Sequence, residues 1–456
     1  MSEVRATFGR RQGIQPPPIR VAPPAPAVGA VAVAPPAGAA ELRIACLARL
    51  DATLLSDATP EQLHADVERL IAEIADEQRI QINGREQRQL AGELVHDMVG
   101  LGPLEPLLDD DSITDIMVNG PDRVFVERRG KLVQTTVRFR DRAHVANVAQ
   151  RIAAGVGRRI DESSPMVDAR LADGSRVNII FPPLALQGAC ISIRKFARRR
   201  IDFDKIVENG SASPQMAKIL RLASAARLNV IISGGTGAGK TTLMNAMSQT
   251  IDEGERIVTV EDAAELQLQQ PHVVSLETRP PSLEGAGEIN QRDLVRNALR
   301  MRPDRLIVGE VRGGEAFDML QAMNTGHDGS MSTIHANTTR DAITRIENMV
   351  QMGQPNLPLR AIRTQIVSAV DLIVQLERMR DGVRRISQVT EVIGMEGEIV
   401  TMNDIFQYEY DGENPDGTLR GFYKVSHIRP AFWSRLVYFN LDRAWSAAID
   451  EAGKST

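Results

Sequence analysis

Residues 234–241 read Gly-Gly-Thr-Gly-Ala-Gly-Lys-Thr, a full match to the phosphate-binding loop pattern Gly-x4-Gly-Lys-Thr. Glycines let the backbone curl so that successive N–H groups face phosphate oxygens, while the lysine reaches the β and γ oxygens and the threonine hydroxyl serves Mg²⁺. The apolar run 229–233 predicts the strand that enters the loop, and residues 242–247 predict the helix that leaves it. The sequence therefore predicts binding of ATP with Mg²⁺ through the loop residues Gly235, Thr236, Gly237, Ala238, Gly239, Lys240, Thr241 and Thr242.

The composition is that of an ordinary soluble globular protein: 456 residues, 43% hydrophobic and 25% charged, enough for two or three domains. The net charge of −5 argues against a general binder of nucleic acids or anionic membranes, so we expect no stable nucleic acid partner. Cys46 and Cys190 form no Cys-x-x-Cys pair and suit a reducing compartment. We expect both to be buried small apolar residues.

The N-terminal segment resembles an export signal only superficially. Arg10 and Arg11 precede an uncharged stretch, 21–40, but five prolines interrupt it. Its longest proline-free piece, 27–34, is eight residues long, far below the roughly 20 apolar residues of a spanning helix. We therefore expect residues 1–40 to be a disordered Pro/Ala-rich tail and the chain to be cytoplasmic.

The patterning divides the chain into parts. Residues 41–100 predict a bundle of three helices, with a start signal at Asn83-Gly84-Arg85-Glu86. Residues 101–205 predict a small α+β N-terminal domain, 206–212 a linker, and 213–456 an α/β ATPase domain with a C-terminal helical and strand subdomain. A helix is expected to begin at Ser213-Pro214, and Trp433 and Trp445 are expected to be packing groups. The other expected elements are strands at 115–118, 124–126, 132–137, 176–181, 189–194, 256–260, 273–277, 306–308, 330–334 and within 386–410, and helices at 142–156, 290–301, 314–323, 338–352 and within 429–451.

Acidic residues follow two of the predicted strands. Glu310 ends the apolar run 306–309, which is where a carboxylate beside a nucleotide-bound metal is expected, so Thr241 and Glu310 are the candidate Mg²⁺ ligands. Glu261 and Asp262 follow 256–260, where a catalytic role and a solvated turn are equally open from the residues alone.

Histidines and arginines gather near these acids. His327 and His335 flank the strand 330–334, and either alone is more often a structural hydrogen-bonding group than a catalyst. The density of arginines between 292 and 312 favours their interpretation as a solvated helix face. At least one of them could instead face phosphate, because a guanidinium binds two oxygens at once. These arginines are Arg292, Arg296, Arg300, Arg302, Arg305 and Arg312.

Several stretches in the right order resemble the secretion ATPase superfamily of type II and type IV secretion, and most closely the Tad/Cpa pilus assembly ATPases. The stretches are 101–108, 115–120, the loop, Glu261-Asp262 (the Asp box), 299–305 with 309–312 (Walker B), and the His box ending at His335. The resemblance covers about 101–379. It implies a RecA-like P-loop domain behind a small N-terminal domain. Secretion ATPases of other branches often carry a four-cysteine zinc module, which two cysteines cannot form.

The resemblance also implies roles for individual residues. Glu310 and Glu261 would share metal handling and water activation, either one taking the proton, and His335 would couple nucleotide state to neighbouring segments. Arg176 and Arg194 would close onto the phosphates as arginine fingers, and Lys240 would act in catalysis.

The implied assembly is a homo-hexameric motor at the cytoplasmic face of the inner membrane, acting on pilus platform proteins to assemble or retract a filament. Two alternatives stay open. One is a conjugation-type secretion ATPase that exports protein or DNA, and the other is a nucleotide-dependent ring scaffold with incidental hydrolysis.

Overall fold

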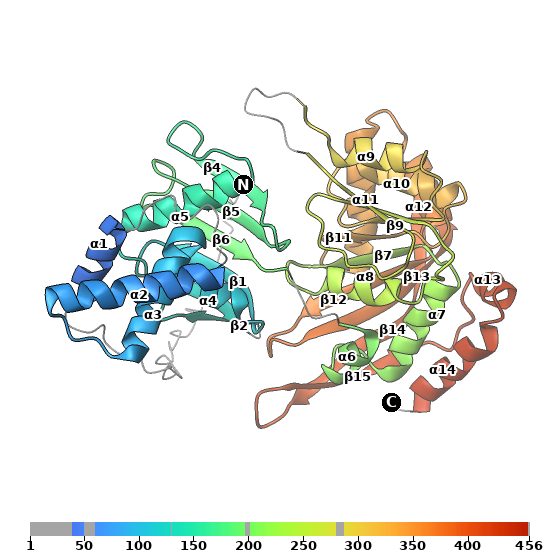
Figure 1. Cartoon of the computed structure of the whole chain (residues 1–456). Helices are drawn as coiled ribbons and strands as arrows, with labels where there is room; N and C mark the ends of the chain where they lie inside the picture. The colour runs from blue at the N-terminus through green and yellow to red at the C-terminus, as the bar shows by residue number, and fades with distance from the viewer. Residues whose placement is uncertain (1–38, 50–59, 129, 197–200, 280–286, 455–456) are drawn as a thin grey trace, which may run out of the picture. The chain divides into compact units, whose positions relative to one another are not determined.

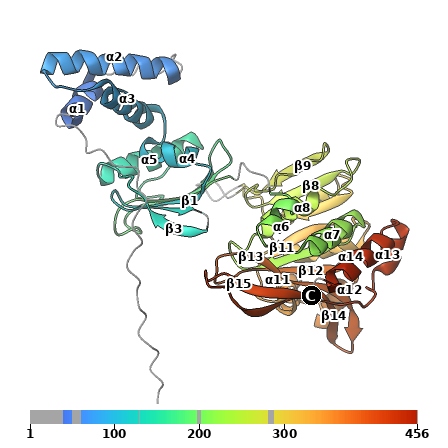
Figure 2. The same ribbon diagram turned by 90° about the horizontal axis from the view of Figure 1, so that it is seen from below.

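The computed structural model describes residues 39–49, 60–128, 130–196, 201–279 and 287–454 (Figures 1 and 2). The predicted Pro/Ala-rich tail, up to residue 38, lies outside the described residues. The chain divides into two compact units, Met1–Val95 and His96–Thr456. Within the described ranges, no helix combines the length and the apolar character that crossing a membrane requires.

The first unit is built from helices. They are α1 (Ala39–Arg49), α2 (Pro60–Gln78) and α3 (Gly84–Val99), whose last residues lie past the unit boundary. The Asn83 side chain accepts hydrogen bonds from the N–H groups of Arg85 and Glu86, and the Glu86 carboxylate accepts one from the Asn83 N–H. This reciprocal cap confirms the predicted start of α3. Cys46 is fully buried among the apolar side chains of this unit.

The second unit begins with a six-stranded antiparallel sheet in the order β3-β2-β1-β6-β5-β4. A short 3-10 turn (Gly102–Leu104), α4 (Glu105–Asp109) and α5 (Arg142–Gly155) contribute to its core. The strands are β1 (Ile113–Asn119), β2 (Val124–Arg128), β3 (Lys131–Gln134), β4 (Met166–Arg170), β5 (Arg176–Ile180) and β6 (Cys190–Arg194).

Two details of this small domain differ from the expectations. Strand β4 was missed because it is an edge strand in which only Val167 is buried, so it lacks the apolar alternation that marks a strand. Cys190, at the start of β6, is only half-buried, whereas full burial was expected.

A nine-stranded mixed sheet forms the rest of the unit, in the order β15-β14-β13-β12-β7-β11-β10-β8-β9. Strands β12, β7, β11, β10, β8 and β9 run parallel, and β13, β14 and β15 extend the sheet antiparallel from β12. Their bounds are β7 (Val230–Gly234), β8 (Ile257–Glu261), β9 (Val273–Glu277), β10 (Arg305–Val308), β11 (Met331–Ile334), β12 (Leu372–Arg378), β13 (Arg384–Glu396), β14 (Ile399–Glu413) and β15 (Leu419–Val425).

Helices cover both faces of this sheet, and Figure 2 shows α7 and α14 side by side. One core contains side chains of α6 (Phe203–Glu208), α7 (Pro214–Ala225), α8 (Lys240–Ser248), α13 (Trp433–Tyr438) and α14 (Asp442–Lys454). The other contains side chains of α9 (Gln291–Ala298), α10 (Glu315–Asn324), α11 (Thr339–Gly353) and α12 (Leu359–Ala369).

Strand β7 begins with three apolar residues because it contributes to both cores. Val230 and Ile232 pack into the first core, and Ile231 packs into the second. The α/β fold class, with a RecA-like P-loop domain behind a small α+β domain, is confirmed. The helix predicted at Ser213-Pro214 is also confirmed, since the Ser213 hydroxyl accepts a hydrogen bond from the Met216 N–H at the start of α7.

Some elements were not predicted. Helix α6 overlaps the predicted linker 206–212, and its Phe203 packs into the first core. Helix α12 and strand β12 were missed because no glycine or proline separates their apolar runs, so neither periodicity stands out. Trp445 is 2% exposed and packs edge-on against Phe432, which confirms a packing role.

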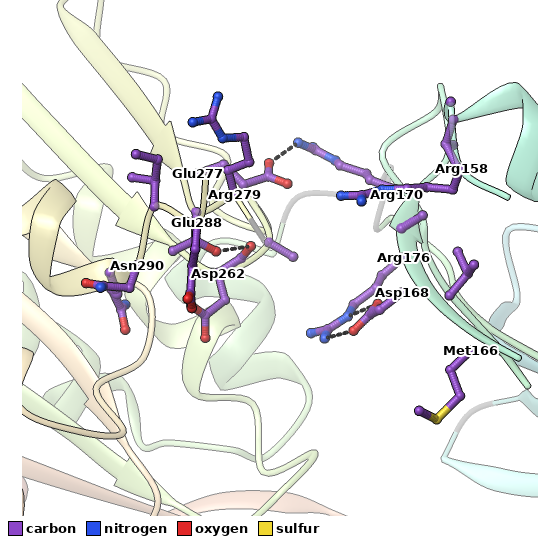
Figure 3. Close-up of a pocket in the computed structure, with 18 of the residues that line it drawn as sticks. Arg158, Met166, Asp168, Arg170, Arg176, Asp262, Glu277, Arg279, Glu288 and Asn290 are labelled. Atoms are coloured by element: carbon purple, nitrogen blue, oxygen red, sulfur yellow. Dashed lines mark hydrogen bonds and ion pairs between the residues drawn. The ribbon is translucent and has the colours of Figure 1, made fainter. Parts of the chain in front are cut away.

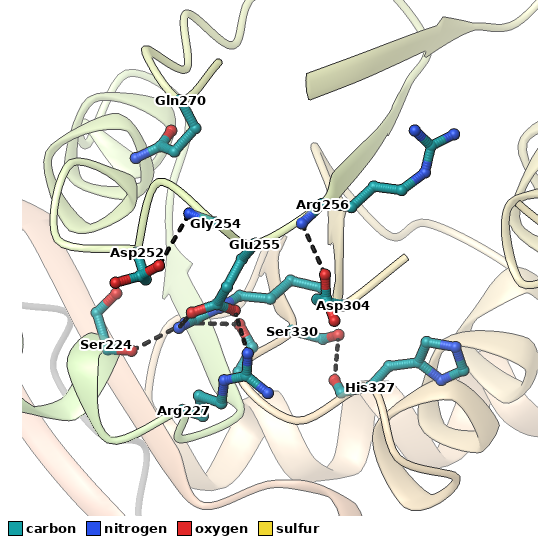
Figure 4. Close-up of polar contacts among 12 residues, drawn as sticks. Ser224, Arg227, Asp252, Gly254, Glu255, Arg256, Gln270, Asp304, His327 and Ser330 are labelled. Carbon is teal, nitrogen blue, oxygen red and sulfur yellow. Dashed lines mark hydrogen bonds and ion pairs between the residues drawn. The ribbon is translucent and has the colours of Figure 1, made fainter. Parts of the chain in front are cut away.

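Arg305 corrects the expectation of a solvated arginine face, and its partners Ser224 and Glu255 are labelled in Figure 4. It lies on β10, is 1% exposed and donates to both carboxylate oxygens of Glu255, at 2.6 and 2.8 Å. It also donates to the Ser224 carbonyl at 2.9 Å, while Arg227 lies 3.0 Å from the same glutamate. Because each charged group is paired and hydrogen-bonded, these contacts join α7, the turn before β8 and β10.

Candidate nucleotide site

The phosphate-binding loop joins the end of β7 to the start of α8. Gly234 ends β7 with φ +156°, and a Cβ atom there would lie 2.5 Å from the backbone oxygen of Leu376, so a side chain does not fit. Gly237 and Gly239 have φ values of +69° and +99°, in the left-handed region that favours glycine. The glycines of the motif therefore match positions where the backbone requires them.

Lys240 turns back into its own loop. Its ammonium group donates to the carbonyls of Gly234 and Gly235, at 2.9 and 3.0 Å, and lies 3.3 Å from Nε2 of His335. The side chain is buried, and this burial lowers the pKa of Lys240, against the opposing effect of Glu310. These contacts hold the amine at the loop, and phosphate oxygens could take the place of the two carbonyls as its hydrogen-bond acceptors.

Glu310 follows Gly309 after the end of β10, beside the end of β11. Its Oε1 atom is 2.9 Å from Nε2 of His335, and its Oε2 atom accepts a hydrogen bond from Arg312. Arg312 also lies 3.3 Å from Oδ2 of Asp262. Burial and then the Lys240 charge lower the pKa of His335, while Glu310 raises it. The predicted Walker B glutamate and His-box histidine are therefore in direct contact.

Glu261 ends β8 and is 3% exposed. Its Oε1 atom accepts hydrogen bonds from the N–H groups of Glu265 and Leu266, at 2.9 and 3.0 Å, while Oε2 has no hydrogen-bond partner in the part of the chain that the structure describes. Burial raises the pKa of Glu261 to about 7, against the effect of the two N–H donors. A carboxyl group of this kind can hold or release a proton near neutral pH.

Arg176 on β5 and Arg194 on β6 lie opposite each other in neighbouring strands. Both line the same pocket as the loop. Arg176 donates to both oxygens of Asp168, at 2.6 and 3.2 Å, as Figure 3 shows, and Arg194 lies 3.5 Å from Oε1 of Glu265. Of the predicted site residues, this pocket brings together Arg176, Arg194, Thr236, Gly237, Ala238, Gly239, Lys240, Thr241, Thr242, Glu261, Glu310 and His335. Gly235 borders it through its carbonyl, which binds Lys240.

Sequence reasoning missed Asp168, Glu265 and the ion pair between Arg170 and Glu277, which measures 3.0 Å (Figure 3). Glu265 lies in a segment without regular structure after β8, so no periodicity could have singled it out. The other histidine singled out, His327, has Nδ1 3.2 Å from the carbonyl oxygen of Ala322, the structural role expected for it.

Most of the remaining arginines lie outside this pocket. Arg292 and Arg296 both bind Asp318, at 2.8 and 3.0 Å. Arg312 is the one member of the predicted arginine cluster that lines the pocket.

Residues 97–404 match the family of type II/IV secretion system proteins, and because this is more than half of the chain, the chain belongs to that family. A protein of Mycobacterium tuberculosis whose name assigns it to conjugal transfer is 41% identical over 309 residues, covering 66% of this chain and 87% of the relative. Conjugal transfer protein TrbB of Rhizobium radiobacter is 36% identical over 294 residues, covering 64% and 86%. The VirB11 ATPase structure from Brucella suis, in complex with sulphate, is 30% identical with a TM-score of 0.34, covering 63% of this chain and 94% of that one.

Proposed function

We propose that this protein hydrolyses ATP and uses the energy to drive a membrane-embedded secretion or pilus machine. The observation that carries the proposal is the convergence of Lys240, Glu310 and His335, with Nε2 of His335 3.3 Å from the lysine and 2.9 Å from the glutamate, beside a loop whose glycines have the required backbone angles. Its membership of the type II/IV secretion family supports the same conclusion.

The residues present fit ATP and Mg²⁺. The loop ends at the N-terminus of α8, where backbone N–H groups favour anions, and Thr241 and Glu310 line the same pocket with oxygen atoms of the kind Mg²⁺ prefers. When bound, Mg²⁺ would neutralise charge on the phosphate oxygens. Lys240 would exchange its two loop carbonyls for phosphate, and Thr241 and Glu310 would hold the metal.

The chain's own carboxylates would handle the proton of the attacking water. Glu310 accepts a hydrogen bond from Arg312 on Oε2 and has Oε1 2.9 Å from Nε2 of His335, whereas Glu261 is buried with one oxygen held by backbone N–H groups. Either group could accept the proton. Because Glu310 contacts His335, a change in the charge of Glu310 would alter the interactions of the segment after β11. Arg176 and Arg194 would stabilise negative charge on the phosphates once released from Asp168 and Glu265.

We further propose that the working form is a homo-hexameric ring at the cytoplasmic face of the inner membrane, bound there through platform proteins. The Tad/Cpa resemblance favours assembly, or also retraction, of a type IV pilus. The names of the relatives that cover most of their own length favour a second candidate, a conjugation-type secretion ATPase. Coexpression with the membrane proteins of each machine, followed by copurification, separates the two.

The test of the motor proposal uses purified full-length protein with ATP and Mg²⁺. Lys240→Ala should abolish nucleotide binding or turnover, and Glu310→Gln should keep binding while turnover falls by a factor of about 100 or more. Arg279→Ala, on the rim of the neighbouring pocket, is the control and should keep wild-type turnover. Unchanged turnover in both site variants would contradict the proposal, and turnover that platform proteins do not stimulate would favour a scaffold.

A further inference from the structure

We infer that Arg384 is a positioning residue for the phosphate-binding loop, and that Glu127 of the small domain acts on the loop through it. The inference rests on the proposed function, because its effect is on the affinity for ATP. Arg384 begins β13 and lies outside the pocket that contains the other candidate site residues.

The contact between Arg384 and the loop is direct. Its Nε atom donates to the carbonyl of Gly237 at 2.8 Å, across 147 residues of sequence. A Cβ atom on Gly239 would lie 3.6 Å from Cδ of Arg384, so the arginine stem runs along the outside of the loop. The hydrogen bond involves a charged donor, which makes it stronger than a bond between neutral groups.

Peptide geometry makes this contact relevant to phosphate binding. In a trans peptide the C=O and N–H groups point in opposite directions, so holding the Gly237 carbonyl from outside directs the Ala238 N–H inward. That N–H donates to the Gly235 carbonyl at a distance of 3.3 Å, a long bond within the loop. Because N–H groups of this kind bind phosphate oxygens, Arg384 orders a donor before the nucleotide arrives.

Arg384 also faces the small domain. Its Nη2 atom lies 3.8 Å from Oε1 of Glu127 on β2, whose side chain is 20% exposed. Opposite charges at this distance and partial burial attract one another, so Glu127 restrains the guanidinium that holds Gly237. A displacement of β2 relative to β13 would therefore change the restraint on the loop.

The chain provides a matched control in Arg378, at the end of β12. It donates to the carbonyl of Gly130, in the turn between β2 and β3 of the small domain. Arg378 therefore joins the β12–β13 hairpin to the small domain, as Arg384 does. Within the described residues, its hydrogen bond leads to the small domain and not to the loop. Replacing Arg378 thus tests the docking of the hairpin without the contact to Gly237.

The experiment measures the dissociation constant of a slowly hydrolysed ATP analogue, and kcat with ATP, on full-length protein. Arg384→Ala should weaken binding about tenfold, with kcat at saturating ATP within about threefold of wild type. Arg384→Lys, whose amine can still reach a carbonyl, should recover part of the affinity. Arg378→Ala should bind within about twofold of wild type. Glu127→Gln should weaken binding about threefold alone and by less than about 1.5-fold in the Arg384→Ala background.

The outcomes separate the two proposals. Wild-type protein that binds no ATP would overturn the proposed function. If wild type binds and Arg384→Ala matches it within about twofold, or if Arg378→Ala weakens binding as strongly, the inference about Arg384 fails. A full effect of Glu127→Gln in the Arg384→Ala background would overturn the role of Glu127. If Arg384→Ala lowers the melting temperature, the inference is judged from the affinity of Arg384→Lys for the ATP analogue. An affinity between those of Arg384→Ala and wild type supports the inference, and an affinity equal to wild type contradicts it.

Discussion

The Nε2 atom of His335 lies 2.9 Å from the Oε1 atom of Glu310. The two residues follow β11 and β10, which are neighbouring parallel strands, so their side chains meet at the carboxyl edge of the sheet. A change in the charge of Glu310 therefore acts directly on a histidine that also faces Lys240.

Replacement of His335 by alanine should lower kcat by a factor of about 10 to 100, because Glu310 loses one of the groups that orient it. The dissociation constant for ATP should change much less. Steady-state turnover and equilibrium binding measure the two effects. His327→Ala, which removes a histidine outside the pocket, serves as the control, and an unchanged kcat for His335→Ala would exclude a coupling role.

Replacement of Arg176 by alanine should reduce kcat by a factor of about 1,000, the lower range of what an arginine finger contributes. Asp168→Asn weakens the ion pair that holds Arg176 and should leave kcat equal or higher. Arg159→Ala tests whether loss of any arginine on this surface has the same effect, since Arg159 is largely exposed and pairs with Asp161. Equal turnover of the Arg176 and Arg159 variants would reject the finger.

Replacement of Glu261 by glutamine should change how stability depends on pH. Burial raises the pKa of this carboxyl from 4.5 to about 7, so its contribution is complete below about pH 4.5 and is lost as the pH rises through 7. In this window the free energy of unfolding should fall with pH by at most about 1.4 kcal/mol per unit, and Glu261→Gln should flatten the slope. Urea unfolding without nucleotide at pH 5 to 8 measures it. An equal slope in wild type and variant would refute the assignment.

Replacement of Arg305 by methionine should destabilise the fold by about 3–5 kcal/mol, because Glu255 is left buried with an incomplete set of partners. The double variant Arg305→Met with Glu255→Leu should recover most of this loss, since neither charge is then buried alone. Lys205→Met breaks an exposed pair with Glu208 and should cost less than about 1 kcal/mol. Urea denaturation compares the three, and similar losses for Arg305 and Lys205 would contradict the argument.

The sequence was sufficient where local chemistry determines the structure. The loop glycines need particular backbone angles, and Asn83 and Ser213 cap helices through hydrogen bonds to residues two or three positions away. Strands β7, β8 and β10 were visible because burial on both faces makes them predominantly apolar. Glu310 could be expected near the nucleotide because it follows such a strand.

Relationships between distant segments could not be predicted in the same way. Nothing local distinguishes Arg305, which is buried, from Arg300, which is exposed, because the difference is made by Glu255, 50 residues away. Likewise, the partners of Arg176 and Arg194 come from β4 and from the segment after β8. Strand β12 lacked a boundary signal, so the hairpin that bears Arg378 and Arg384 was not expected either.

The position of β7 between β11 and β12 has a consequence for biosynthesis. Asn229, just before β7, is held by Asp371, which the ribosome adds 142 residues later. At a translation rate of about 5–20 residues per second, this delay is about 7 to 28 s. For most of that time neither β11 nor β12 has been made, and β11 alone is available in the last part of it. We therefore expect the emerging polypeptide to acquire nucleotide affinity only after β12 has left the exit tunnel, and to need protection of the apolar residues of β7 until then.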